Sequence, residues 1–219
     1  MSSEELQRVE RTYRRIGRRW AYNVLSFAAF QGWEGLIRRR AVSRLELREG
    51  HAVLDVACGR GANLALLLQA VGEMGRVVGV DFSETMLEGG RELAAKNRWS
   101  NLELLRKDAA EMDYEAEFDG AITTLGMTVI PRWREALDRM TAAVRPGGRL
   151  VVFDGGLGRG LKRLWNPYYG LLARFTAADL SRDVPGECRR LLDDVREETV
   201  FGSNSYIVSG RARGKDEAR

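Results

Sequence analysis

Residues 53–63 read Val53-Leu54-Asp55-Val56-Ala57-Cys58-Gly59-Arg60-Gly61-Ala62-Asn63 and decide the fold. An apolar, β-branched run that breaks into Gly-x-Gly and restarts in a helical pattern predicts a strand, a tight loop and a helix. Because glycine has no Cβ and tolerates positive φ, a ligand can approach the backbone closely over Gly59 and Gly61. We therefore expect a small, nucleotide-like molecule at this loop.

A second apolar run, Val77-Val78-Gly79-Val80-Asp81, ends in a carboxylate. Open α/β sheets bind ligands at the carboxyl ends of their parallel strands, where one carboxylate accepts hydrogen bonds from two ribose hydroxyls. A dinucleotide fingerprint would place its third glycine at position 64, but the residue there is Leu64, and the loop has no Lys-Ser or Lys-Thr pair for a phosphate. The pattern therefore predicts an adenosine site without a pyrophosphate cradle.

Four segments resemble, in order, the motifs of class I S-adenosylmethionine-dependent methyltransferases. They are residues 54–61, 79–86, 107–109 and 145–150. The resemblance implies S-adenosyl-L-methionine as the cofactor. It also implies an α/β fold with a doubly wound, mostly parallel, seven-stranded Rossmann-like sheet and an N-terminal helical lid.

The same resemblance assigns parts of the cofactor to individual residues. Asp55 and the glycine loop face the methionine part, Asp81 holds the ribose, and Asp108 with Ala109 caps the adenine amino group. The full set of implied cofactor-binding residues is Asp55, Ala57, Cys58, Gly59, Gly61, Asn63, Asp81, Phe82, Ser83, Met86, Asp108, Ala109, Thr124 and Leu125.

Length and composition favour one catalytic domain. The chain has 219 residues and a formal net charge of +4, enough for a single well-buried core. Cys58, Cys188 and His51 are too few for a disulfide framework, a zinc site or a histidine-based triad, so we expect no metal. Without a membrane-length apolar stretch or a signal sequence, we expect a soluble, cytoplasmic protein.

Hydrophobic periodicity predicts alternating strands and helices after residue 50, typical of a parallel sheet with helices on both faces. The expected strands are 52–57, 76–81, 102–107, 118–124 and 148–154. The expected helices are 33–45, 62–71, 84–97 and 132–144, with helical cover over 158–186 and a closing hairpin of 199–201 with 206–209. We interpret 1–48 as the lid and acceptor-site segment, 49–211 as the cofactor-binding core and 212–219 as a disordered tail.

The N-terminal segment combines an apolar stripe with positive charge. Apolar residues recur at alternating spacings of three and four over residues 6–27, as in an amphipathic helix, and residues 1–50 carry eleven arginines against six acidic residues. Such a helix suits either a lid packed on the domain or peripheral contact with an anionic membrane. The two interpretations are compatible.

The methyl acceptor can be narrowed by resemblance. Residues 22–27, 39–42, 47–50 and 119–127 are similar to segments of the ubiquinone and menaquinone biosynthesis methyltransferases, over about residues 20–155. This similarity implies a small, lipophilic, quinone-type ring as the acceptor. Beyond Asp154 the resemblance fades, so a phospholipid N-methyltransferase at the membrane surface stays an alternative. A nucleic-acid methyltransferase and a non-catalytic cofactor-binding protein are further alternatives.

A ring acceptor would need its hydroxyl deprotonated, which calls for a nearby base. The catalytic candidates are Tyr22, Tyr168 and Tyr169, with Tyr13 and Asp154 as further groups that can assist. A nucleic-acid substrate is disfavoured because the chain has no appended RNA-binding module and no cysteine after the fourth strand, where Thr124 and Leu125 lie.

Overall fold

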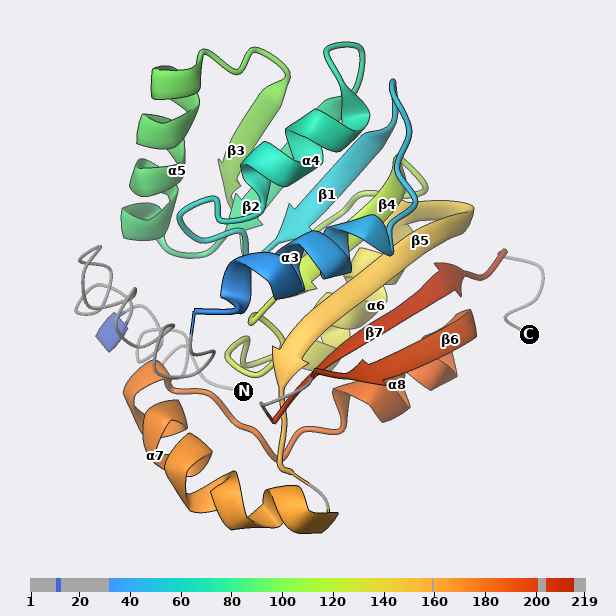
Figure 1. The fold of residues 1–219 in the computed structure, drawn as a ribbon. Coiled ribbons are helices and arrows are strands. Elements are labelled where there is room, and N and C mark those ends of the chain that lie inside the picture. The colour runs from blue at the N-terminus through green and yellow to red at the C-terminus, as the bar shows by residue number, and fades with distance from the viewer. Residues whose placement is uncertain (1–10, 13–31, 159, 201–203, 215–219) are drawn as a thin grey trace.

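The computed structural model describes residues 11–12, 32–158, 160–200 and 204–214. Seven strands form one sheet in the order β3-β2-β1-β4-β5-β7-β6 (Figure 1). Strands β1 to β5 pair in parallel, and β7 runs antiparallel to both β5 and β6. The strands are β1 Ala52–Val56, β2 Arg76–Asp81, β3 Leu102–Arg106, β4 Phe118–Thr124, β5 Val144–Gly155, β6 Leu192–Thr199 and β7 Ser205–Ala212. The predicted doubly wound, mostly parallel seven-stranded sheet is confirmed.

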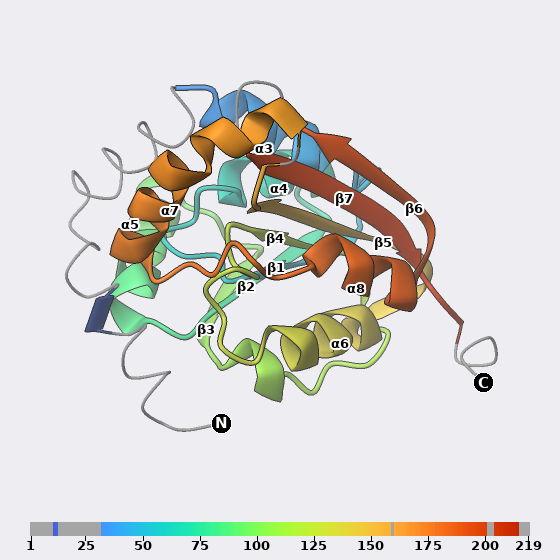
Figure 2. The same ribbon diagram turned by 90° about the horizontal axis from the view of Figure 1, so that it is seen from below.

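Helices cover both faces of the sheet, as Figure 2 shows, with α3 and α4 on one side and α6 and α8 on the other. The helices are α3 Glu34–Ser43, α4 Leu64–Val71, α5 Glu84–Asn97, α6 Trp133–Ala143, α7 Asn166–Thr176 and α8 Val184–Leu191, with short 3-10 turns η1 Ala109–Glu111 and η2 Gly160–Trp165. Neighbouring residues of β1 point to opposite faces, so Val53 packs in the core under α3 and α4 while Leu54 packs in the core that includes α6.

The glycine loop delays the start of α4 by two residues relative to the sequence prediction. The Gly61 N–H donates to the Cys58 carbonyl, and the Leu64 N–H donates to the Gly61 carbonyl. These turns occupy residues 58–63, and the helix begins at Leu64.

The closing hairpin differs more from the prediction. Its first strand, expected at 199–201, is β6 Leu192–Thr199, and α8 runs to Leu191, past the expected end of helical cover at 186. The stretch Leu192-Asp193-Asp194 carries little β-propensity. Asp194 adopts a positive φ of 50° where the register with β7 shifts. Pairing with β7 at the sheet edge therefore overrides the local sequence preference.

Part of the proposed segmentation lies outside the described residues. This applies to the predicted helix over 6–27, apart from residues 11–12, and to 215–219 of the predicted tail. Helix α3 packs on the sheet face through Ile37 and Ala41. Across the described part of the chain, no helix has both the length and the apolar character needed to cross a bilayer.

Candidate active site

A cavity of about 230 Å³ lies at the carboxyl ends of β1, β2, β4 and β5, with α7 forming its far wall. Several residues predicted for the site meet at this cavity. They are Ala57, Cys58, Gly59, Asp81, Phe82, Ser83, Met86, Asp108, Ala109, Thr124, Leu125 and Tyr169. Asp55, Gly61 and Asn63 lie behind the loop and do not line the cavity.

The loop after β1 has the left-handed backbone that its glycines predict. Gly59 has φ +57° and Gly61 has φ +86°, while Ala57 takes φ 54° despite its Cβ. A Cβ on Gly59 would meet no atom of the described residues within 4 Å, so this backbone borders open space in the described part of the chain. A Cβ on Gly61 would lie 2.5 Å from Leu64 Cδ1 and would displace that side chain, and the φ of +86° adds backbone strain for any other residue.

Asp81 holds this loop from the end of β2. Its Oδ2 accepts a hydrogen bond from the Gly59 N–H at 2.8 Å, and its Oδ1 accepts one from the Ser83 N–H at 2.9 Å. Burial raises the pKa of the Asp81 carboxyl, and the backbone N–H donors oppose that rise. The carboxylate thus lines the cavity and also fixes the loop.

Behind the loop, Asp55 belongs to a buried polar chain. The Asn63 side-chain amide donates to Asp55 Oδ1 at 2.9 Å and to Thr124 Oγ1 at 3.0 Å. The other oxygen, Asp55 Oδ2, is buried with no hydrogen-bond partner among the described residues. Burial raises the pKa of the Asp55 carboxyl to about 7, and Asn63 and Arg38 oppose that rise while Asp81 adds to it.

Arg38 of α3 is the last member of this buried group of hydrogen-bonded side chains, and it was not predicted from the sequence. The side chain is 6% exposed, forms an ion pair with Glu34 at 2.6 Å, and donates to Asn63 Oδ1 at 3.0 Å and to Thr124 Oγ1. It also lines the cavity. The available signal was its spacing, because Arg38 lies three residues before Ala41 on the buried face of the helix.

The raised pKa of Asp55 predicts a pH dependence of stability. The pKa of the Asp55 carboxyl is about 7 in the folded state, against an ordinary value of 3.8. Between pH 3.8 and pH 7 the folded protein therefore holds a proton that unfolding releases. The free energy of unfolding therefore falls as pH rises through this window. We expect Asp55→Asn to remove about 2–3 kcal/mol of the drop between pH 5 and pH 8, measured by urea unfolding. Identical pH profiles for the two proteins would contradict this assignment.

The adenine end of the predicted site contains an ion pair that the sequence analysis did not foresee. Asp108 Oδ1 accepts from the Ala110 N–H at 2.9 Å, and Asp108 Oδ2 accepts from Arg132 Nη2 at 2.8 Å. Arg132 also contacts Glu111 at 2.7 Å. Arg132 follows β4 by eight positions, so only the fold brings it to Asp108. The Asp108 carboxylate is thereby held at the cavity wall.

The opposite half of the cavity is mainly apolar and contains one buried carboxylate. Its apolar lining includes Leu172, Ala173 and Leu180. Asp154 Oδ1 accepts from Thr128 Oγ1 at 2.7 Å, and Asp154 Oδ2 accepts from the Thr128 N–H at 3.1 Å. Burial raises the pKa of the Asp154 carboxyl to about 6, against the opposing effect of these hydrogen bonds.

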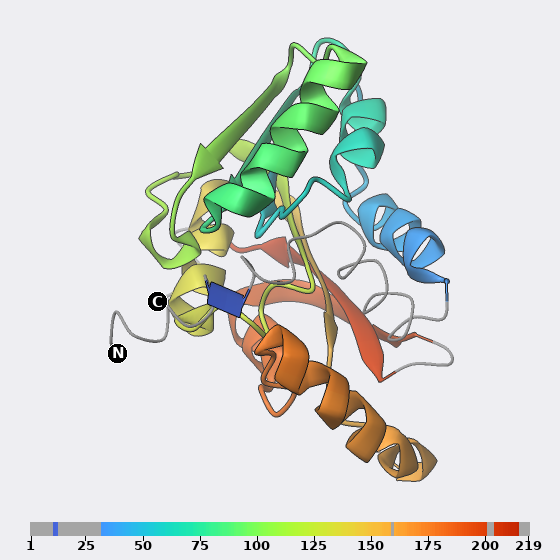
Figure 3. The same ribbon diagram turned by 90° about the vertical axis from the view of Figure 1, so that its left-hand side faces the viewer.

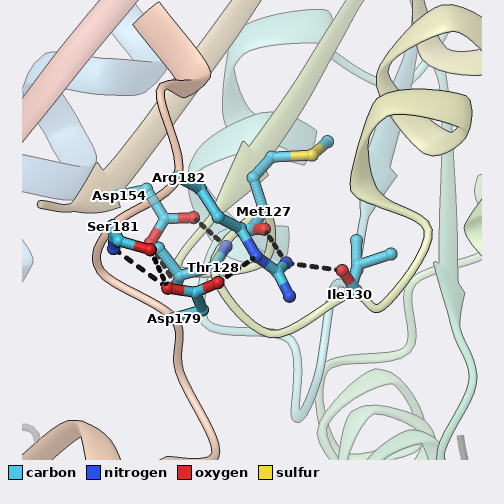
Figure 4. A network of polar contacts seen from close by, with 7 residues as sticks. All are labelled: Met127, Thr128, Ile130, Asp154, Asp179, Ser181 and Arg182. Atoms are coloured by element: carbon cyan, nitrogen blue, oxygen red, sulfur yellow. Dashed lines mark hydrogen bonds and ion pairs between the residues drawn. The ribbon is translucent and has the colours of Figure 1, made fainter. Parts of the chain in front are cut away.

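Arg182 joins the loop after β4 to the segment that follows α7 (Figure 4). Its Nη1 donates to the carbonyls of Met127 and Ile130, at 2.6 Å each, and its Nε lies 3.4 Å from Asp179 Oδ2. The Asp179 N–H in turn donates to the Thr128 carbonyl at 2.8 Å. Two segments that line the cavity are therefore tied together around Asp154.

The three predicted catalytic tyrosines have different positions. Tyr169 lines the cavity, and burial raises the pKa of its hydroxyl. Tyr168 lies one residue earlier on α7, is 40% exposed and does not line the cavity. Tyr22, like Tyr13, lies outside the described residues. The residues with described positions contain no cluster of three or more His, Cys, Asp or Glu side chains arranged to hold a metal ion.

Comparison with known proteins identifies relatives of most of the chain. The sequence profile of the ubiE/COQ5 methyltransferase family matches residues 1–159. A demethylmenaquinone methyltransferase of Staphylococcus aureus (strain MRSA252) is 34% identical over 151 residues, which are 68% of this chain and 60% of that protein. The chain thus spans about 60% of the length of the curated relatives it matches.

Solved structures share the fold at low sequence identity. A phosphoethanolamine N-methyltransferase 2 from Haemonchus contortus, solved in complex with S-adenosyl-L-methionine, aligns with a TM-score of 0.70 and 15% identity, over 93% of this chain and 60% of that chain. A SAM-dependent methyltransferase from Aquifex aeolicus aligns with a TM-score of 0.55 and 20% identity, over 80% of this chain and 88% of that chain.

Proposed function

Because the chain belongs to the ubiE/COQ5 methyltransferase family, we propose that it transfers a methyl group from S-adenosyl-L-methionine to a lipophilic, quinol-type ring. The observation that carries this proposal is a single cavity with two different halves. One half is built from the glycine loop, Asp81 and Asp108, and the other is an apolar chamber under α7 that contains Asp154. A polar cofactor and a lipophilic ring fit such a cavity side by side.

The residues present fit the cofactor. Open space over the Gly59 backbone accommodates a ligand at the loop, and Asp81 is an acceptor for ribose hydroxyls. Phe82 and Met86 supply apolar surface for the adenine. The Asp55 carboxyl lies behind the loop and does not line the cavity, so it favours a cationic group such as the methionine ammonium through its charge and not by contact.

The chemistry needs little from the protein beyond orientation and proton removal. When bound, the cofactor supplies an activated methyl group on its sulfonium. Holding the ring in line with that methyl is worth about 7–11 kcal/mol of barrier, and the apolar wall with Leu172 and Ala173 provides the support. Because Asp154 lines the same cavity, we expect it to accept a proton from a ring hydroxyl, which makes the ring more nucleophilic.

Arg38 is proposed to bind the carboxylate of the methionine part. It is a buried guanidinium at the cavity wall, beside the loop and Thr124. We expect Arg38→Met to weaken cofactor binding about tenfold to hundredfold, since a charged hydrogen bond is worth about 1.5–3 kcal/mol. The measurement is calorimetric titration with S-adenosylmethionine. Arg40→Met is the control, because Arg40 is exposed on the same helix and pairs with Glu198. Equal affinities for both variants would remove Arg38 from the site.

The function is tested with labelled S-adenosylmethionine and three acceptors. These are a reduced demethylmenaquinone, phosphatidylethanolamine and transfer RNA, each offered to the full chain in mild detergent. We expect label in the quinol alone. Label in the phospholipid or the RNA would overturn the proposed acceptor in favour of an alternative class. Cofactor binding without transfer to any of the three would overturn the proposed activity on these acceptors.

The N-terminal segment keeps its proposed role as a lid. A stripe over residues 6–27 suits closure over a lipophilic acceptor and contact with anionic lipid, and it lies outside the described residues except for 11–12. The protein is further proposed to act in the cytoplasm, in part at a membrane surface.

A further inference from the structure

Helix α7 carries apolar residues on two different faces. One face lines the cavity with Tyr169, Leu172, Ala173 and Thr176. The other face, extended by the preceding turn η2, carries a stripe at spacings of four, three and four residues, which is the period of one helix side. This outer stripe consists of Leu164, Tyr168, Leu171 and Phe175, with Trp165 beside it. Figures 1 and 3 show α7 beyond the carboxyl end of β5, projecting from the sheet.

The outer stripe is exposed to a degree unusual for such large side chains. Leu164 is 80% exposed, Trp165 is 60% exposed, and Phe175 is 57% exposed. A contiguous exposed apolar patch marks a surface that contacts something else. We therefore expect the outer stripe to contact a partner that is itself apolar.

Charge identifies the class of that partner. Residues 160–178 contain Lys162, Arg163 and Arg174 and no aspartate or glutamate, and the Arg163 and Arg174 side chains are exposed. Tryptophan and tyrosine prefer the level of lipid headgroups, and arginines attract anionic lipids. A second copy of the chain is a poorer partner, since a two-fold contact through this face would bring Arg163 and Arg174 close to the same arginines of the other copy.

We propose that the outer face of α7 docks on an anionic lipid bilayer. The outer face is defined by Leu164, Trp165, Tyr168, Leu171 and Phe175. Because another face of the same helix lines the cavity, docking brings the acceptor chamber close to the lipid. This access route rests on the proposed lipophilic acceptor, whereas the docking itself does not. The helix lies beyond residue 159, where the family match ends.

The test is sedimentation of the full chain with vesicles of phosphatidylcholine alone or with one quarter phosphatidylglycerol. We expect sedimentation with the anionic vesicles, weakened by high salt. Phe175→Asp and Trp165→Asp should each lower the vesicle partition coefficient at least tenfold. Arg174→Gln should lower it about fivefold, as roughly 1 kcal/mol per surface arginine implies.

Two matched controls assign the contact to this face. Met74→Asp changes a side chain that is 81% exposed next to the amino end of β2, far from the cavity, and should sediment like the unaltered protein. Trp20→Asp changes Trp20, which is one of the apolar residues of the predicted stripe over 6–27. Loss of sedimentation in Trp20→Asp with no loss in Phe175→Asp would overturn the proposal and assign the contact to the N-terminal segment.

Three further outcomes would also overturn it. One is the absence of sedimentation with either vesicle, and another is equal sedimentation of all variants. The third is a dimer in analytical ultracentrifugation that Phe175→Asp converts to a monomer, which would identify a second copy as the cover. Vesicle binding needs no acceptor, so its failure is distinguishable from failure of the methyl-transfer assay.

Discussion

Gly59→Val is expected to abolish methyl transfer, with a loss in kcat/KM of more than about a hundredfold, because even small misplacement of a reactant is that costly. At φ +57° a side-chained residue is strained, most of all a β-branched one. The new side chain would also project from the loop into space where, apart from the neighbouring residues 58 and 60, no atom of the described residues lies within 4 Å of its Cβ. We expect this space to hold the cofactor, so binding by calorimetry should be lost together with activity.

The control variant Gly50→Val distinguishes the effect of backbone strain from the effect of a side chain that fills the cofactor space. Gly50 has φ +84°, a Cβ there would also meet nothing within 4 Å, and the residue does not line the cavity. This control should lose comparable stability in urea unfolding and keep its cofactor affinity. If Gly59→Val binds and methylates as well as Gly50→Val, the loop does not contact the cofactor.

Asp81→Ala has the second large expected effect, a cofactor dissociation constant raised about tenfold to hundredfold. The estimate follows from about 1.5–3 kcal/mol for a charge-assisted hydrogen bond. The structure adds a second reason, because the substitution also removes the acceptor of the Gly59 N–H and so loosens the loop. The measurement is calorimetric titration, with circular dichroism to verify folding.

A matched control for Asp81 exists at the amino end of β4, at the other end of the strands from the cavity. Asp119 also accepts a hydrogen bond from a backbone N–H, that of Ala52 at 2.8 Å, and it does not line the cavity. Asp119→Ala should therefore leave cofactor affinity unchanged. If Asp81→Ala behaves like Asp119→Ala in the titration, Asp81 has no contact with the cofactor.

The sheet and the glycine loop were predictable because the residues that determine them lie next to one another in the sequence. β1 and β2 are short apolar runs ended by a glycine turn or by Asp81, and the turn requires positive φ that only a few residue types supply readily. The edge strand β6 was misjudged at its start because Asp193 and Asp194 disfavour a strand in isolation. Its pairing with β7 depends on contacts that the local sequence does not contain.

Arg38, which lines the cavity, and Arg182, which ties its walls together, were missed for a related reason. Arg38 reaches Thr124 across 86 positions of sequence, and Arg182 reaches Met127 across 55. Among 31 arginines in the chain, nothing in the local pattern singles these out, except that Arg38 interrupts the buried face of a helix. Their partners are defined only once the strands have aligned the loops.

The hydrogen bonds that Arg182 donates to the Met127 and Ile130 carbonyls bear on how acceptor choice can change during evolution. The wall that we expect to hold the cofactor is built from residues before 159, and the apolar wall of the chamber comes largely from a later segment fastened to the loop after β4 through Arg182 and Asp179. Drift in that later segment can reshape the chamber while the glycine loop and Asp81 stay in place. We therefore expect the cofactor site to stay the same among relatives while the acceptor chamber varies. Exchanging residues 160–191 between relatives is a rational route to altered acceptor choice.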